Sequence, residues 1–441
     1  SFNKKDFYYH RGRRFPKKEH LKPNRSDSLI RHLFERNKLP CIYFCFGRRR
    51  CEYLAEEMRG FDFLNAEEKV KIRGLFNELC ERFDLVGDKK ASSIFPLIER
   101  GIAFHHAGML PTLKEVIERL FTSRLIKVIF TTETFALGIN MPARTVIFDE
   151  LRKYYGRFHR NLKTRDFYQM AGRAGRRGID EEGFVYSRIN SRYLSLPELK
   201  EIIYGNPERV RSRFNASYAT VLNLYEKHGE KIYDIYPRSF HAFQEKKKRQ
   251  EKALAALHAK VQILKEFGCI EKNKLTGKGL FAAKIYGYEL SLSELYAENV
   301  LEYLSAKELG ILCLALVYEP RRGVARPPVK KHIKGMQNRT DEIVSQIQKR
   351  ETKLGIVPLS KAYSYGLSTA LEAWMKGEEF DKMLQLTECD EGEIIRYYRM
   401  AMQILREILD TPVSPQLKEN AKKAIYLINR GVIDAEKQLR G

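Results

Sequence analysis

Short apolar runs alternate with longer amphipathic segments between residues 26 and 195. The apolar runs, each of the length of a buried strand, are residues 41–46, 102–104, 127–130, 145–148 and 183–186. Helical periodicity is found between them and before them, as at residues 28–37 and 49–58. Strands alternating with helices are typical of a parallel sheet with helices on both faces. The pattern predicts an α/β lobe with a parallel sheet over residues 26–195, with a charged helical insertion at 61–100.

The strand rhythm nearly stops after residue 196, and the rest of the chain is predicted to be mostly helical. Three helical segments and a short β-like piece follow one another at residues 198–203, 209–226, 240–267 and 270–275. This order is the outline of a winged helix, which we place at residues 196–290. A helical domain is expected at 291–441. Residues 1–25 are basic and lack periodicity, which indicates an arm or linker.

Charge adds a partner to this picture. The 441 residues include 80 Lys and Arg against 56 Asp and Glu, a formal net charge of +24. Such a surplus repels itself unless an anionic partner lies nearby, and the commonest such partner is a nucleic-acid backbone. The alternative is a soluble protein whose basic surface is simply solvated. The 43% hydrophobic content is that of a globular protein with cores, so disorder is not expected.

The cysteines and the length of the apolar runs indicate in which cellular compartment the protein works and whether it contacts a membrane. The seven cysteines form no CxxC pair and no Cys/His ligand cluster, which favours reduced thiols and a cytoplasmic location, or a nuclear one in a eukaryote. His105 and His106 are adjacent but lack companions at ligand spacing, so no metal site is expected. No apolar run approaches the roughly 20 residues that span a bilayer, so no membrane partner is expected. Because residue 1 is serine, we expect the chain to be processed or cut from a longer one.

The most informative stretch is residues 167–178, Phe-Tyr-Gln-Met-Ala-Gly-Arg-Ala-Gly-Arg-Arg-Gly. On a helix, Gln169, Arg173 and Arg176 stand at i, i+4 and i+7 and project from one face. Small residues between them let that face approach another surface, and paired guanidiniums suit the phosphate charge that develops during hydrolysis. The alternative is a surface helix with solvated arginines. Glycines inside a helix cost about 1 kcal/mol each relative to alanine, which favours the functional interpretation.

A second stretch, residues 128–142, runs from a hydrophobic strand into polar groups. These groups include Thr131, Thr132, Gly138 and Asn140. Strand ends in parallel sheets are where ligands bind, and hydroxyls and backbone amides there can hold a sugar-phosphate backbone without reading bases. The alternative is an ordinary strand end with helix-capping threonines. A third stretch, residues 104–109 (Phe-His-His-Ala-Gly-Met), is a weak signal by itself.

In this order the three stretches resemble motifs IVa, V and VI of superfamily-two DExH-box helicases, specifically the superkiller-type, exosome-associated RNA helicases. Residues 45–51 match the motif IV region of that family, although serine is usual where this chain has Gly47. Residues 213–218 resemble the entry into the family's winged helix. Residues 391–396 and 427–433 resemble its C-terminal helical domain, which contains a ratchet helix. The resemblance covers roughly residues 28–441 and is most specific in the glycine-arginine stretch. It implies that the α/β lobe at residues 26–195 is the second RecA-like lobe of a helicase.

The resemblance implies roles for residues around a bound nucleotide. Arg173 and Arg176 would contact the γ-phosphate of ATP held with Mg²⁺ between two lobes. Gln169 would help to couple that contact to the interface between the lobes. Gly138 and Asn140 would lie near the nucleotide.

The resemblance also implies a path for nucleic acid. Thr131, Thr132 and Gly108 would touch the backbone of a single strand. The ratchet helix, at about residues 393–409, would offer Arg396 and Arg399 to the emerging strand. The next two residues after Arg396, Tyr397 and Tyr398, are adjacent, so we expect at most one of them to face the strand for stacking. The alternative for this segment is an amphipathic core helix.

Two departures from the family matter. The sequence contains no GxxxxGK[ST] loop and no Asp-Glu-x-His box, the parts that cradle phosphates and hold magnesium. These belong to a first RecA-like lobe, so this polypeptide alone is expected not to hydrolyse ATP. The β-rich arch that exosome-associated members insert into the winged-helix region is also absent, which argues against assuming that the protein docks on an exosome.

The sequence thus predicts the C-terminal part of an ATP-dependent RNA helicase that moves along single-stranded nucleic acid. The expected partners are single-stranded RNA, or DNA, and a first RecA-like lobe, with the protein acting as a monomer. RNA rather than DNA follows from the resemblance alone, since nothing in the residues reads a 2′-hydroxyl. Two alternatives stay open: a non-catalytic nucleic-acid-binding scaffold that retains the shape of the lobe, and a DNA helicase of the related repair class.

Overall fold

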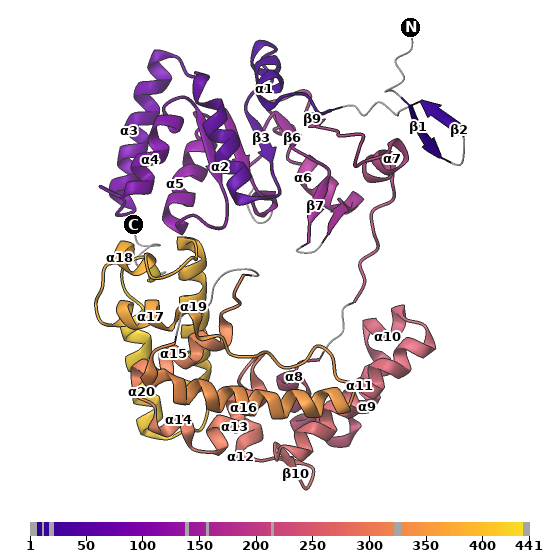
Figure 1. The fold of residues 1–441 in the computed structure, drawn as a ribbon, viewed down its shortest axis with the longest axis vertical. Coiled ribbons are helices and arrows are strands. Elements are labelled where there is room, and N and C mark those ends of the chain that lie inside the picture. The colour runs from indigo at the N-terminus through magenta and orange to yellow at the C-terminus, as the bar shows by residue number, and fades with distance from the viewer. Residues whose placement is uncertain are drawn as a thin grey trace. The chain divides into compact units, whose positions relative to one another are not determined.

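The computed structural model describes residues 22–136, 141–155, 158–212, 216–321 and 329–434, and the backbone of two short strands nearer the N-terminus. Those strands, β1 (Phe7–His10) and β2 (Arg13–Pro16), pair as an antiparallel hairpin in the segment that the sequence indicates to be an unstructured arm. The chain divides into two compact units (Figure 1), of which the first contains residues 1–209 and the second residues 210–440. Each unit is described here by itself.

The first unit is built on a five-stranded parallel sheet. Its strands, in spatial order, are β4 (Ile102–His105), β5 (Val128–Thr131), β3 (Cys41–Phe44), β6 (Thr145–Phe148) and β9 (Phe184–Ser187). Each strand coincides with an expected apolar run to within two residues at either end, so the predicted α/β lobe is confirmed. All four residues of each of the central strands β3, β5 and β6 are buried. Because successive side chains point to opposite faces, both faces of the sheet are covered.

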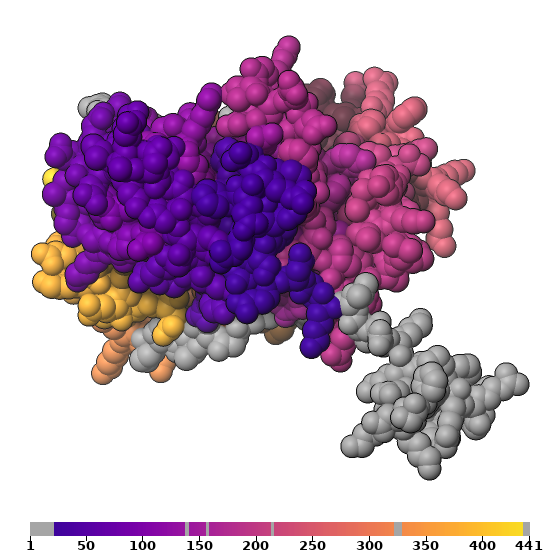
Figure 2. Space-filling model, turned by 90° about the horizontal axis from the view of Figure 1, so that it is seen from above, coloured from indigo at the N-terminus to yellow at the C-terminus, as the bar shows by residue number. Residues whose placement is uncertain are grey.

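Helices provide that covering. They are α1 (Ser26–Glu35), α2 (Arg48–Glu57), α3 (Ala66–Arg82), α4 (Lys89–Ile98), α5 (Pro111–Thr122), α6 (Thr164–Ala171) and α7 (Leu196–Tyr204). The insertion at 61–100 is helical, as predicted, and consists of α3 and α4. A short antiparallel hairpin of β7 (Arg152–Tyr154) and β8 (His159–Asn161) lies between β6 and α6. In the space-filling view of Figure 2, the indigo and purple side chains of the first unit form a continuous surface.

Within the described residues of the second unit, the regular structure is helical apart from one two-stranded hairpin. Its elements are α8 (Tyr218–His228), α9 (Ile232–Ile235), α10 (Phe240–Gln244), α11 (Lys247–Glu266), β10 (Ile270–Glu271), β11 (Lys274–Leu275), α12 (Gly277–Ala282), α13 (Glu289–Ala297), α14 (Val300–Tyr303), α15 (Ala306–Val317), α16 (Lys331–Lys353), α17 (Ser368–Met375), α18 (Phe380–Leu384), α19 (Glu391–Leu409) and α20 (Pro415–Ile428). The helix α15 is apolar on all sides and buried over residues 309–317, so it forms the centre of the core together with α19 and α20.

Two contacts bear on the domain boundaries that the sequence predicts at 195/196 and 290/291. The helix α7 packs on α6 in the first unit, where Tyr168 Oη donates to the carbonyl oxygen of Ile203 at 2.8 Å. The buried carboxylate of Glu351 on α16 accepts a hydrogen bond from Tyr218 Oη on α8 at 2.8 Å. Contacts therefore cross both positions, and the boundaries stay predictions.

Candidate functional site

The stretch 167–178 is not one helix. The helix α6 ends at Ala171 with Gly172 as its C-cap, and Gly175 has a φ of +89°, which L side chains rarely adopt. A Cβ on Gly172 would lie 3.0 Å from the carbonyl oxygen of Tyr168. The expectation that Gln169 and both arginines share one helix face is therefore wrong. The two glycines serve a backbone turn, and the helix cost that favoured function at the sequence level does not arise.

This turn pairs with a distant segment of the lobe. Ala143 N donates to the Arg173 carbonyl oxygen at 2.9 Å, and Gly175 N donates to the Ala143 carbonyl oxygen at 2.7 Å. These bonds form an isolated parallel bridge between Ala143 and Ala174. The turn at residues 172–178, here called the arginine loop, therefore lies beside the end of the second candidate stretch. The sequence resemblance implied this proximity, but the local pattern did not show it.

Arg173 is held by that second stretch. Its Nη2 donates to the carbonyl oxygen of Ala136 at 2.5 Å, at the end of the 3₁₀ turn Glu133–Ala136. Gly138 and Asn140, which the resemblance places near a nucleotide, lie outside the described residues. Gln169 is exposed on α6.

Arg176 is held by a carboxylate that sequence reasoning missed. Its Nε and Nη2 donate to the two oxygens of Asp180, each at 2.7 Å, and its backbone N donates to Asp180 Oδ2 at 2.9 Å. The hydrogen bond from Arg176 lowers the pKa of Asp180, so this carboxyl group is ionised at neutral pH. The i, i+4 spacing of opposite charges was the available signal. The ion pair with Asp180 therefore occupies the Nε/Nη2 edge of the Arg176 guanidinium, which is one of the two edges that can bind a phosphate.

A pocket of about 390 Å³ opens beside the arginine loop. Its charged lining is Arg124, Arg176 and Arg177, and its apolar lining includes Met141, Pro142 and Ile179. An arginine-rich rim next to an apolar wall can accept an anionic ligand that also has an apolar face.

The three residues of the lobe that are predicted to touch a nucleic-acid backbone differ in how accessible they are to solvent. Thr131 is fully buried, and its hydroxyl donates to the His105 carbonyl oxygen at 2.9 Å, so its side chain cannot contact a strand. Gly108 is buried, and its N–H donates to His106 Nδ1 at 3.2 Å. Thr132 is partly exposed and shares a hydrogen bond of 2.9 Å with the Thr134 hydroxyl. Of these predicted contacts, only the Thr132 hydroxyl reaches the surface.

The two histidines of the third stretch are paired with carboxylates. His105 Nε2 lies 2.7 Å from Glu118 Oε1, and His106 Nε2 lies 2.8 Å from Glu52 Oε1. Burial lowers the pKa of His105, although Glu118 opposes the shift. Among the described residues, no three His, Cys, Asp or Glu side chains are grouped so that they could hold a metal ion.

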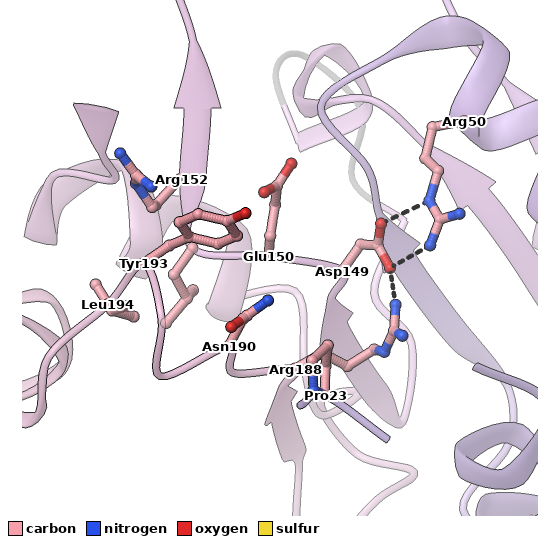
Figure 3. A pocket seen from close by; sticks show the side chains of 10 residues that line it. Pro23, Arg50, Asp149, Glu150, Arg152, Arg188, Asn190, Tyr193 and Leu194 are labelled. Carbon is pink, nitrogen blue, oxygen red and sulfur yellow. Dashed lines mark hydrogen bonds and ion pairs between the residues drawn. The ribbon is translucent and has the colours of Figure 1, made fainter. Parts of the chain in front are cut away.

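A second pocket, of about 250 Å³, contains a carboxylate at the end of β6 (Figure 3). Asp149 lies between Arg50 and Arg188, with its Oδ2 2.8 Å from Arg50 Nε, and it also accepts a bond from Tyr43 Oη at 3.0 Å. Burial raises the pKa of Asp149, but the bonds from Arg50 and the charges of Arg50 and Arg188 outweigh it and leave the pKa lowered. Burial and then the charge of Asp149 raise the pKa of neighbouring Glu150. The network ties β3, α2 and the end of β9 to β6. This network was not predicted from the sequence, although a carboxylate directly after the apolar run at residues 145–148 was an available signal.

The helix predicted to be a ratchet, α19, exposes one of its two arginines freely. Arg396 is exposed and lies 4.5 Å from the Tyr397 ring, while the Arg399 Nε donates to the Ile433 carbonyl oxygen at 2.9 Å. Tyr397 and Tyr398 are both buried, at 6% and 0% exposure. Both rings belong to the core, so neither is available to stack on a base, which is compatible with the expectation of at most one.

Comparisons with known proteins agree with this architecture. The model of the helicase conserved C-terminal domain matches residues 75–178, and the model of the DSHCT (NUC185) domain matches residues 272–436. Among the described residues, no helix is long and apolar enough to cross a membrane.

Three relatives illustrate the likeness. The chain is 37% identical to superkiller complex protein 2 of Homo sapiens over 272 residues, 60% of this chain and 21% of that protein. It is 38% identical to the antiviral helicase SKI2 of Saccharomyces cerevisiae over 248 residues, 55% of this chain and 19% of that protein. It is 39% identical to the exosome RNA helicase MTR4 of Homo sapiens over 225 residues, 50% of this chain and 21% of that protein. The match thus spans about a fifth of each relative. With its parallel sheet, the chain contains the helicase conserved C-terminal domain and the DSHCT (NUC185) domain, and it corresponds to the C-terminal portion of superfamily-two DExH-box helicases.

Proposed function

We propose that this chain is the C-terminal part of an ATP-dependent RNA helicase, which couples ATP hydrolysis to movement along single-stranded nucleic acid. The observation that carries the proposal is the backbone bridge between Ala143 and Ala174, which brings the arginine loop against the segment that follows β5. Both segments line the arginine-rich pocket. The name of one relative, the exosome RNA helicase MTR4, supports RNA as the substrate class.

In this proposal Arg173 and Arg176 contact the γ-phosphate of ATP, and Gln169 couples that contact to the lobe interface. A guanidinium fork fits a phosphate in the same bidentate way in which Arg176 fits Asp180, so a phosphate has to compete with that carboxylate. Most of the ATP, and the Mg²⁺ that neutralises charge on its phosphates, are assigned to a first RecA-like lobe, a proposed partner of this chain. Gly138 and Asn140 are proposed to lie near the nucleotide.

The nucleic-acid path is proposed to use Thr132 on the lobe and Arg396 on α19, with Gly108 and Arg399 close to it. The net charge of +24 supplies the attraction that a phosphate backbone requires. We also propose that the protein is a monomer and works in the cytoplasm or nucleus, a setting in which free thiols such as those of its cysteines stay reduced.

An ATPase assay tests the proposal. The rate is measured for this chain alone and for the longer reading frame around it, with and without single-stranded RNA. We expect activity only in the longer protein, stimulated by RNA, and a loss of about 10³-fold or more for Arg176→Ala, the scale of an arginine finger. Arg165→Ala is the matched control, because Arg165 is an exposed arginine on α6 that does not line the arginine-rich pocket, and it should retain activity.

The scaffold alternative has one observation in its favour. The Nε/Nη2 edge of Arg176 already binds Asp180, so a phosphate has to displace this carboxylate or bind the Nη1/Nη2 edge instead. If the longer protein binds RNA but hydrolyses no ATP, the arginine loop has no role in hydrolysis. The protein is then a non-catalytic nucleic-acid-binding scaffold and not a helicase.

A further inference from the structure

Exposed aromatic rings gather where α10 meets α11, in the second unit. Phe240 and Phe243 lie one turn apart on α10 with 57% and 85% of their surfaces exposed. Their ring centroids are 6.5 Å apart, and the ring planes are inclined by only 17°. Val210, held beside α10 by Gln244, is 70% exposed. Single exposed apolar residues are ordinary, but a group of large ones marks an interaction surface.

Cations crowd the same corner. Lys246 is the N-cap of α11, Lys247 and Lys248 begin its first turn, and that turn contains no acidic residue. A helix N-terminus has a partial positive charge, so lysines there are unfavourable unless an anion binds. Arg249 is paired with Glu245 at 2.9 Å. Lys246, Lys247 and Lys248 are exposed and make no ion pair within the described part of the chain.

The corner is rigid. Gln250 Nε2 donates to the carbonyl oxygens of Ala242 at 2.6 Å and Glu245 at 2.9 Å, which fixes α11 against α10. Gln244 Oε1 accepts from Ser212 N at 2.8 Å. A ligand that binds a surface already held in place loses little affinity to ordering it.

We propose that this α10–α11 corner, formed by Phe240, Phe243, Lys246, Lys247 and Lys248, is a contact for single-stranded RNA separate from the RecA-like lobe. Bases can stack on the two exposed rings whatever their sequence, because every base has an aromatic face. Phosphates can meet the lysines and the unpaired N–H groups at the start of α11. One anionic, base-carrying ligand thereby relieves two unfavourable features, exposed aromatic surface and lysines at a helix N-terminus. The inference rests on the proposed function only for RNA as the strand.

Fluorescence anisotropy of a labelled oligouridine, titrated with the 441-residue chain, tests the aromatic part. Phe243→Ala should weaken binding about fivefold or more, the effect of losing one stacked base. Tyr303→Ala is the matched control, since Tyr303 is 86% exposed on α14 in the same unit, and its affinity should not change. Wild-type affinity in Phe243→Ala overturns the inference and leaves a protein partner as the occupant of the corner.

The salt dependence tests the lysines and is independent of how Phe243→Ala folds. Lys247→Ala/Lys248→Ala should reduce the slope of log affinity against log salt by about 1.4, at about 0.7 for each phosphate contact on a single strand. Lys349→Ala/Lys353→Ala, two exposed lysines of α16, should leave the slope unchanged. An equal reduction in both pairs means diffuse attraction and overturns the inference. If the longer protein has no ATPase activity but the variants still differ from their controls in RNA binding, the proposed function is refuted. The inferred RNA contact at the α10–α11 corner then still stands.

Discussion

The ion pair of Arg176 and Asp180 sets the state of the arginine loop in the absence of a ligand. Two hydrogen bonds of 2.7 Å satisfy both ends of the carboxylate, and the backbone N–H of Arg176 adds a third bond at 2.9 Å. Because the bond from Arg176 lowers the pKa of Asp180, the pair is neutral overall at physiological pH. Under the proposed function, ATP binding exchanges one anion for another at Arg176. The loop therefore needs a local rearrangement, not a new charge, to become active.

His105 should make the first unit sensitive to acid. Burial lowers the pKa of His105, although Glu118 opposes the shift. Below about pH 6.5 the imidazole is therefore protonated in the unfolded chain while it stays neutral in the folded chain. Stability is fully present above that pH and is lost below it, by up to about 1.4 kcal/mol for each pH unit. Denaturant midpoints of the chain at about pH 7.5 and about pH 5.5 measure the loss. The loss should be smaller in His105→Gln.

The control for this prediction is His228→Gln, because His228 is exposed at the end of α8. It should show the same loss of stability as the wild-type chain. Identical pH profiles for the wild-type chain and His105→Gln would contradict the assignment of the effect to His105. Glu118, Lys114 and His106 are the charged or titratable groups that act on this imidazole.

At the scale of elements, the end of α6 shows how a turn can hide inside a helical pattern. The polar spacing of residues 169, 173 and 176 continues the helical period, but the backbone leaves the helix at Gly172. Close approach explains the surrounding glycines: a Cβ on Gly183 would lie 2.6 Å from the carbonyl carbon of Ala174. The absence of a side chain at Gly183 therefore lets this residue approach Ala174, the residue that forms the bridge with Ala143.

Alanine substitutions should separate two kinds of glycine. Gly175→Ala should destabilise the first unit by about 1–2 kcal/mol, because a φ of +89° is strained for any L side chain. Gly74→Ala lies inside α3 with no atom within 4 Å of the added methyl group, and it should stabilise by about 0.4–1 kcal/mol. Urea unfolding of both variants measures the difference. Effects of the same sign would show that Gly175 has no special conformational role.

At the scale of the molecule, a buried carboxylate ties the winged-helix segment to the C-terminal helices in the second unit. Glu351 is fully buried and accepts hydrogen bonds from Tyr218 Oη at 2.8 Å, Ser360 Oγ at 2.7 Å and Ser360 N at 2.7 Å. Nearby, Glu289 Oε1 accepts from Ala219 N at 2.9 Å. Both bonds to α8 come from residues near or beyond the predicted boundary at 290/291, so the two segments are expected to unfold together.

Glu351→Ala should destabilise the second unit as a whole. It leaves Tyr218 Oη and the Ser360 groups buried without their acceptor, at about 1–3 kcal/mol for each unsatisfied group. Urea unfolding should show one transition at a lower midpoint. Glu342→Ala is the control on the same helix, since Glu342 is exposed in a surface pair with Arg339 and should change stability by less than about 1 kcal/mol. An unchanged midpoint for Glu351→Ala, or separate unfolding of residues 216–290, would contradict the coupling.

The sequence by itself determined the α/β lobe, the helical remainder and the family. An apolar run such as residues 41–44 has no charged side chain to place in water, which favours a buried strand. The candidate positions could be named because their residue types and order are visible locally.

Only the tertiary structure decided which of those positions are available and what holds them. Thr131 is buried by the His105 strand beside it, Tyr398 is buried with its hydroxyl 3.5 Å from Met383 Sδ, and the turn at Gly172 is completed by Ala143. These partners lie far apart along the chain, and periodicity reports only what neighbours within a few turns share. Burial and pairing depend on which distant segments meet, because a side chain becomes inaccessible through contacts that its own segment does not encode.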